Sequence, residues 1–126
     1  HKVADLPELW REKMGEYLGV VPERDRDGVL QDVHWSDGSF GYFPTYTLGN
    51  IYALQLTSAM RRDLPHFEEL VRKDLTPIRD WLREKVHRYG NLYPPRQLML
   101  KATGEELNAE HLIRYLKRKY GEIYSL

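Results

Sequence analysis

Apolar residues recur at helical spacing along most of the chain. Between Leu6 and Leu18 the large apolar side chains return every three or four positions, which predicts a helix. Asp5 is placed to cap this helix and Gly19 to end it. The same pattern predicts further helices over residues 47–63, 65–73, 76–90, 96–102 and from 108 to 120. The fold class is therefore predicted to be mainly α, with about six helices.

Two of the predicted helices begin with recognisable capping residues. Thr76 precedes Pro77, and threonine as cap with proline at the first helical position is a favourable start. Asn108 is predicted to cap the last helix, whose apolar face includes Leu112 and Leu116. The apolar faces of these helices are explained by packing on a core and do not indicate a further function.

Residues 28–46 break the helical pattern. Aromatic and polar side chains crowd there without a period of 3.6 or 2.0 residues, so we expect an irregular or briefly extended segment. Gly38 and Gly41 bracket two residues, and Pro44 follows Tyr42-Phe43, so the backbone must bend or approach another group closely. Such a composition is typical of a binding or catalytic loop.

Composition excludes several classes of function. Nineteen basic and nineteen acidic residues cancel, which argues against nucleic-acid and membrane partners. The absence of cysteine excludes disulfides and thiolate metal sites, and no apolar run approaches the roughly 20 residues of a membrane span. A charged fraction of 30% without cysteine favours a thermophilic, cytoplasmic protein. The 126 residues suffice for one domain, residues 1–126, which we interpret as a piece of a longer protein because it begins with His1.

The histidines do not form a recognisable metal site. None of the five lies three or four residues from another, although zinc ligands on helices normally do. We interpret His66, His87 and His111 as surface or capping residues. The paired carboxylates Glu68-Glu69 and Glu105-Glu106 fall in helical or capping positions.

A motif in the irregular segment carries a family resemblance. Gly28-x-x-Gln31-Asp32-x-His34-Trp35 matches the G-x-x-Q-D-x-H-W signature of the thermostable metallocarboxypeptidases, the carboxypeptidase Taq family, and residues 41–50 resemble the segment that follows it there. The resemblance continues in Asp5-Leu6-Pro7, Tyr93-Pro94-Pro95 and Thr103-Gly104-Glu105. The family binds its metal through H-E-x-x-H and a later glutamate, and this sequence contains no H-E-x-x-H. It therefore resembles only the C-terminal portion of a larger helical metallopeptidase.

The resemblance implies an enzyme that removes single amino acids from peptide C-termini. It implies a divalent metal, zinc or cobalt, in the complete enzyme, a peptide substrate and a homodimer. We expect this chain alone to bind no metal and to be inactive without the remainder of the peptidase chain. We also expect that it exposes an apolar patch where its missing neighbours would pack.

Candidate site residues follow from the same stretch. A tyrosine hydroxyl donates a hydrogen bond while uncharged, which suits it to stabilise an oxyanion. Residues 38–43 also resemble the G-x-x-G-Y run of the thimet-oligopeptidase-like metallopeptidases, whose tyrosines have that role. We predict Tyr42 as oxyanion donor and His34 as second donor or substrate-binding group. We predict Tyr46 as an auxiliary substrate-binding residue, with the wall of the site held by Gln31, Asp32 and Trp35.

Two alternatives remain open at this point. Gln31, Asp32 and His34 could satisfy buried backbone groups while Trp35 and Phe40 fill the core beneath them. The whole chain could instead be a non-catalytic helical interaction or dimerisation module. An arginine is the natural partner for the substrate carboxylate, but spacing does not single one out among Arg61, Arg62, Arg79 and Arg96.

Overall fold

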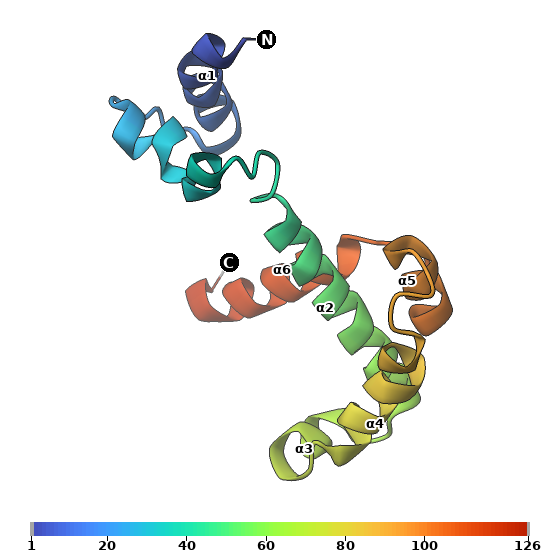
Figure 1. The fold of residues 1–126 in the computed structure, drawn as a ribbon. Helices are drawn as coiled ribbons and strands as arrows, with labels where there is room; N and C mark the ends of the chain where they lie inside the picture. The colour runs from blue at the N-terminus through green and yellow to red at the C-terminus, as the bar shows by residue number, and fades with distance from the viewer. Residues whose placement is uncertain (1, 126) are drawn as a thin grey trace. The chain divides into compact units, whose positions relative to one another are not determined.

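The computed structural model describes residues 2–125, and all the regular structure in that range is helical (Figure 1). The six α-helices are α1 (Leu6–Leu18), α2 (Thr45–Asp63), α3 (Phe67–Lys73), α4 (Thr76–Lys85), α5 (Pro95–Thr103) and α6 (Glu110–Tyr124). The 3₁₀ helices are η1 (Val3–Asp5), η2 (Asp25–Asp27), η3 (Val29–Gln31), η4 (Val33–Asp37) and η5 (His87–Tyr89). The predicted mainly α fold with about six helices is confirmed. None of the described helices combines the length and apolar character needed to cross a membrane.

The chain divides into two compact units, unit 1 (His1–Thr45) and unit 2 (Tyr46–Leu126). In unit 1, α1 ends at Gly19, which adopts the left-handed conformation with φ 68° as its position predicted. Asp5 occupies the capping position of α1, but its carboxylate accepts a hydrogen bond from the Lys2 backbone N–H at 2.7 Å and does not cap the helix.

Gly28, the first residue of the motif, is buried against α1 and the loop that follows it. A Cβ atom at this position would lie 3.1 Å from Cβ of Pro22 and 3.2 Å from Cδ1 of Trp10. Both contacts are tighter than ordinary van der Waals contact, so a side chain here would force its neighbours to shift by a few tenths of an ångström. The glycine therefore fixes where the motif begins.

Residues 28–44 are short 3₁₀ helices and turns and residues 45–46 already belong to α2, so of the two predicted forms the segment is irregular and not extended. Asp32 starts η4 by accepting a hydrogen bond from the His34 backbone N–H at 3.1 Å. Gly38 ends η4 with φ 82°, and Gly41 follows with φ 78°. Both values lie in the left-handed region that glycine adopts without strain, and the bends predicted at these glycines are therefore confirmed.

Unit 2 has a small core between the end of α2, α3 and α4. Ala59, Met60, Phe67 and Trp81 are buried there, and α3 and α4 lie beside one another (Figure 1). Helix α2 begins two residues before the predicted Thr47. Helix α4 ends at Lys85 and continues only as η5 towards Gly90, so the single helix predicted over residues 76–90 is interrupted.

The capping residues of two helices differ from the prediction. Thr76 is the first residue of α4, and its backbone N–H donates to Oδ1 of Asp74 at 2.9 Å, so Asp74 supplies the side-chain acceptor that was predicted of Thr76. Asn108 lies two residues before the first residue of α6, and its Oδ1 accepts from the Glu110 backbone N–H at 3.0 Å. Asn108 therefore accepts the predicted capping hydrogen bond, but it lies one position before the N-cap residue of α6, Ala109.

The Trp81 side chain also ties α4 to the end of α2. Its indole Nε1–H donates to Oδ2 of Asp63 at 3.0 Å, and Nε of Arg62 donates to Oδ1 of the same carboxylate at 2.9 Å. The bond from Trp81, with a smaller contribution from Arg62, lowers the pKa of Asp63 below its ordinary value of 3.8.

We therefore predict that Asp63 contributes to stability above pH 3.8. Because its pKa is lowered by folding, the contribution is fully present above the unfolded value and is lost as the pH falls through the folded one. Replacing Asp63 by Asn should flatten the loss of unfolding free energy between about pH 5 and pH 2, measured by urea denaturation at a series of pH values. An unchanged slope in Asp63→Asn would show that this carboxylate has no linked proton.

Candidate functional site

The central pair of the site is Asp32 and His34, at the start of η4. Asp32 is buried, with 9% of its surface exposed, and its Oδ1 lies 2.8 Å from Nδ1 of His34. The His34 side chain is 19% exposed. An ionised carboxylate can only accept, so Nδ1 carries a hydrogen and the ring is held in one orientation, with Nε2 on the side away from Asp32.

The aromatic part of the site forms where the two glycine bends return the chain towards His34. The ring centroid of Tyr42 lies 5.0 Å from that of His34 with the planes inclined at 38°, and the Phe43 ring lies 5.5 Å away in an edge-on contact. The carbonyl oxygen of Tyr42 accepts two hydrogen bonds from Thr45, from the backbone N–H at 2.9 Å and the hydroxyl at 2.7 Å. Backbone and ring are thus positioned, while Tyr42 remains 50% exposed.

Gln31 and Trp35 help to hold this segment in place through their contacts within unit 1. Nε2 of Gln31 donates to the Arg26 carbonyl oxygen at 2.5 Å, and this hydrogen bond is exposed, so it does not satisfy a buried backbone group. The Trp35 ring stacks on Phe40 at 5.6 Å and meets the edge of Trp10 at 6.1 Å. The alternative in which Phe40 fills the core does not hold, because 63% of Phe40 is exposed.

Tyr46 is the remaining predicted site residue. It is the second residue of α2 and the first of unit 2, and 56% of it is exposed. Asp32, His34 and Tyr42 therefore form a group within unit 1, and the auxiliary role of Tyr46 stays a prediction.

Unit 2 contains a polar cluster that sequence reasoning missed. Nδ1 of His111 lies 2.8 Å from Oγ of Ser58, and its Nε2 contacts Oε1 of Glu105. The His111 side chain is only 11% exposed, so interpreting it as a surface or capping residue was wrong. The hydrogen bond from His111, with a second from Asn108, lowers the pKa of Glu105. A separation of 53 residues between Ser58 and His111 leaves no spacing signal in the sequence.

This cluster of serine, histidine and glutamate is not arranged for nucleophilic catalysis. Ser58 lies inside α2, where its hydroxyl also donates to the Leu54 carbonyl oxygen at 3.0 Å. The backbone N–H groups of a helix interior are committed to helical hydrogen bonds, so none is available as an oxyanion donor. The cluster holds α6 against α2.

The described side chains that could bind a metal ion are not gathered into a metal site. Across residues 2–125, no group of three or more His, Asp or Glu side chains is arranged to hold one. The Asp32–His34 pair provides two such groups, fewer than the three protein ligands of an ordinary catalytic zinc site.

Comparisons with known proteins place this geometry in context. The family model for carboxypeptidase Taq (M32) metallopeptidases matches residues 1–120. The chain is 49% identical over 120 residues to thermostable carboxypeptidase 1 of Pyrococcus furiosus, covering 94% of this chain and 24% of that protein. It is 51% identical over 125 residues to carboxypeptidase 1 of Bacillus subtilis, covering 98% and 25%.

Solved structures agree with the sequence comparison. A structure of Pyrococcus furiosus carboxypeptidase in an apo-Mg form superposes with a TM-score of 0.86 at 49% identity, over 95% of this chain and 24% of that one. Trypanosoma cruzi metallocarboxypeptidase 1 gives a TM-score of 0.85 at 44% identity, over 95% and 26%. The chain thus spans about a quarter of the length of the curated relatives it matches.

Proposed function

The chain belongs to the carboxypeptidase Taq (M32) metallopeptidase family, and from that membership we propose that it is the C-terminal part of a metal-dependent carboxypeptidase. The complete enzyme would release single amino acids from peptide C-termini. This part of it would form the wall of the site that binds the peptide and stabilises the oxyanion. The metal ligands would lie in the remainder of the polypeptide, since the residues described here offer no set of them.

The grouping of Asp32, His34 and Tyr42 carries this proposal. When water attacks a peptide carbonyl, negative charge develops on the carbonyl oxygen, and a neutral donor positioned beforehand lowers the barrier. The hydroxyl of Tyr42 is such a donor, on a half-exposed ring that substrate can reach. Its carbonyl oxygen is tied to Thr45, which restrains the backbone, and its ring contacts that of His34, which lowers the cost of orienting the hydroxyl.

His34 supplies the second polar group of the wall. Its Nδ1–H is held by Asp32, so Nε2 of the neutral ring would accept a hydrogen bond from substrate, and it would donate to the same oxygen only as an imidazolium. Asp32 acts by orienting the imidazole, and Gln31 and Trp35 act by fixing the segment that carries it. Tyr46 would contribute from α2 as an auxiliary substrate-binding group.

Further properties of the complete enzyme are part of this proposal. The metal is zinc or cobalt, the enzyme is a homodimer, and it works in the cytoplasm. Family membership supports a divalent metal, while the absence of cysteine and the 30% of charged residues favour a thermophilic protein of a reducing compartment. Metal analysis and light scattering of the complete polypeptide test the first two properties directly.

The test of function compares the complete polypeptide that contains these residues with the 126 residues alone. We expect the complete protein to release C-terminal amino acids from unblocked and N-blocked peptides, and to lose this activity on chelation. The 126 residues alone should release none and should show no stoichiometric zinc or cobalt binding by calorimetry. Activity or tight metal binding in the short chain would contradict the proposal. A complete polypeptide that dimerises but cleaves no peptide would favour a non-catalytic dimerisation module.

A further inference from the structure

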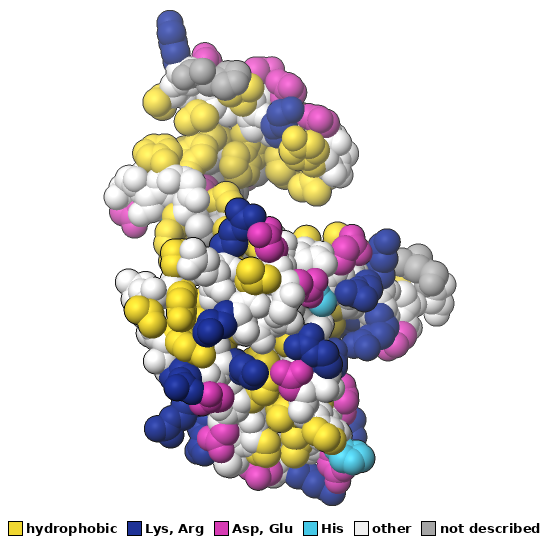
Figure 2. All heavy atoms as spheres, turned by 90° about the vertical axis from the view of Figure 1, so that its right-hand side faces the viewer, with side chains coloured by type: hydrophobic (Ala, Val, Ile, Leu, Met, Phe, Trp, Pro, Cys, Tyr) yellow, Lys and Arg dark blue, Asp and Glu magenta, His cyan; other side chains and the backbone are white. Residues whose placement is uncertain are grey.

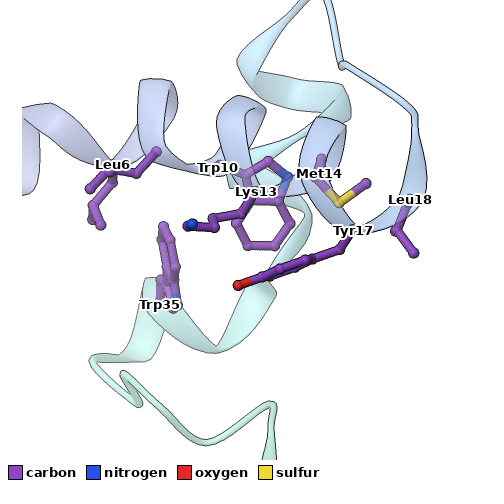
Figure 3. Close-up of a pocket in the computed structure, with 8 residues that line it drawn as sticks. Leu6, Trp10, Lys13, Met14, Tyr17, Leu18 and Trp35 are labelled. Atoms are coloured by element: carbon purple, nitrogen blue, oxygen red, sulfur yellow. The ribbon is translucent and has the colours of Figure 1, made fainter.

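One face of α1 forms an apolar cleft within unit 1. The cleft has a volume of about 420 Å³, and Figure 3 shows the side chains of α1 that face Trp35 of η4 across it. Its lining includes Leu6, Trp10, Met14, Tyr17, Leu18 and Trp35. None of the 13 residues of α1 is buried, so the apolar face that the sequence predicted lacks the cover such a face normally has.

The α1 cleft offers no polar chemistry to a charged ligand. Lys13 is the charged residue of its lining, and the ammonium group is already bound by Glu16 at 2.6 Å and lies 3.7 Å from Glu12. Tyr17 and Leu18 are 70% and 65% exposed. Figure 2 shows hydrophobic side chains gathered on unit 1. Exposed apolar side chains that line one cleft are typical of a site of association.

The exposed area of the chain also indicates missing cover. The chain exposes 9721 Å². Two separate globular proteins with the masses of unit 1 and unit 2 would together expose about 8,500 Å². The excess of about 1,200 Å² is therefore not explained by the division into two units.

We propose that the α1 cleft receives a helix from the part of the same polypeptide that lies outside these 126 residues. This inference rests on the proposed function, because it assumes that the chain is part of a longer enzyme. The region that the chain matches is about a quarter of each relative's length. The segment is a helix, because a helix satisfies its own backbone and a cleft without polar partners cannot satisfy an extended one. It presents apolar residues at every third or fourth position.

Filling the α1 cleft would also position the candidate site. Trp35 forms one wall of the cleft and directly follows His34 in η4. A helix that packs on Trp35 restrains η4, and with it the pair of Asp32 and His34. The cleft therefore connects the remainder of the enzyme to the wall of the site.

Cysteine labelling tests this proposal, and the 126 residues contribute no background labelling because they contain no cysteine. Single variants Met14→Cys and Leu18→Cys place a thiol in the α1 cleft. Glu8→Cys is the control, on a side chain of α1 that is 85% exposed and does not line the cleft. Each variant is made in the 126-residue chain and in the complete polypeptide, and maleimide labelling at that position is followed by mass spectrometry.

We expect the two cleft thiols to react at least tenfold more slowly in the complete polypeptide than in the short chain, while Glu8→Cys reacts equally in both. Equal rates at all three positions would overturn the proposal. Protection that rises with protein concentration would assign the cleft to a second copy of the chain, and protection that appears only with added peptide would assign it to substrate. Both results also overturn it. Peptidase activity of the unmodified complete protein is measured separately, so a failure of the proposed function is recognised independently.

Discussion

Replacing Tyr42 by Phe in the complete enzyme should lower turnover by about 10²–10³, a loss of roughly 2.7–4 kcal/mol of transition-state stabilisation. The substitution removes one hydroxyl and keeps the ring that packs at 5.0 Å from His34, so the local structure should persist. A donor to the oxyanion acts in the transition state and little in the ground state, so the Michaelis constant should change little. Steady-state kinetics with a blocked dipeptide and metal analysis of the purified variant are the measurements.

Tyr52→Phe is the matched control for this prediction. Tyr52 is a partly buried residue of α2, outside the proposed site, and loss of its hydroxyl should reduce turnover much less than tenfold. Normal turnover in Tyr42→Phe would return this residue to a structural role, and the same test would pass to His34 and Tyr46. A large rise in the Michaelis constant alone would instead make Tyr42 a residue that binds the ground state.

The sequence was sufficient for the features that depend on neighbouring residues. Apolar spacing located all six α-helices, and Gly19 ended α1 where predicted because only the local backbone conformation decides that position. The bends at Gly38 and Gly41 also followed from residue type. At the candidate site, Asp32 and His34 belong to the motif and Tyr42 to the glycine-rich run that follows it, and the short chain segment between them makes their proximity a local property.

Features that depend on contacts between distant residues could not be predicted. His111 looked isolated because its partner Ser58 is 53 residues away along the chain. The role of α1 is the clearest case, since its apolar face is visible in the sequence while the helix that we propose to cover it is not.

Gln55 also makes contacts with residues distant in the sequence. Its replacement by Leu should have the largest effect on the free energy of unfolding. It is fully buried, at 0% exposure, and its side chain joins α2 to the loop before α6. Its Nε2 donates to the Glu106 carbonyl oxygen at 2.9 Å and to Oγ1 of Thr103 at 3.1 Å, while its Oε1 accepts from the Asn108 backbone N–H at 3.0 Å. Leucine fills a similar volume but leaves these groups without their partner.

Each buried polar group left unsatisfied costs about 1–3 kcal/mol, so we expect Gln55→Leu to lower the free energy of unfolding by about 3 kcal/mol. That is about a hundredfold change in the folding equilibrium. Urea denaturation measures it, and faster amide exchange in α6 should accompany it because the Asn108 anchor is lost. Gln97→Leu, at an exposed position of α5, is the control and should change stability by less than about 0.5 kcal/mol. If the two variants lose stability equally, the amide of Gln55 contributes no more than an exposed one, and the junction between α2 and α6 depends on packing and the His111 cluster instead.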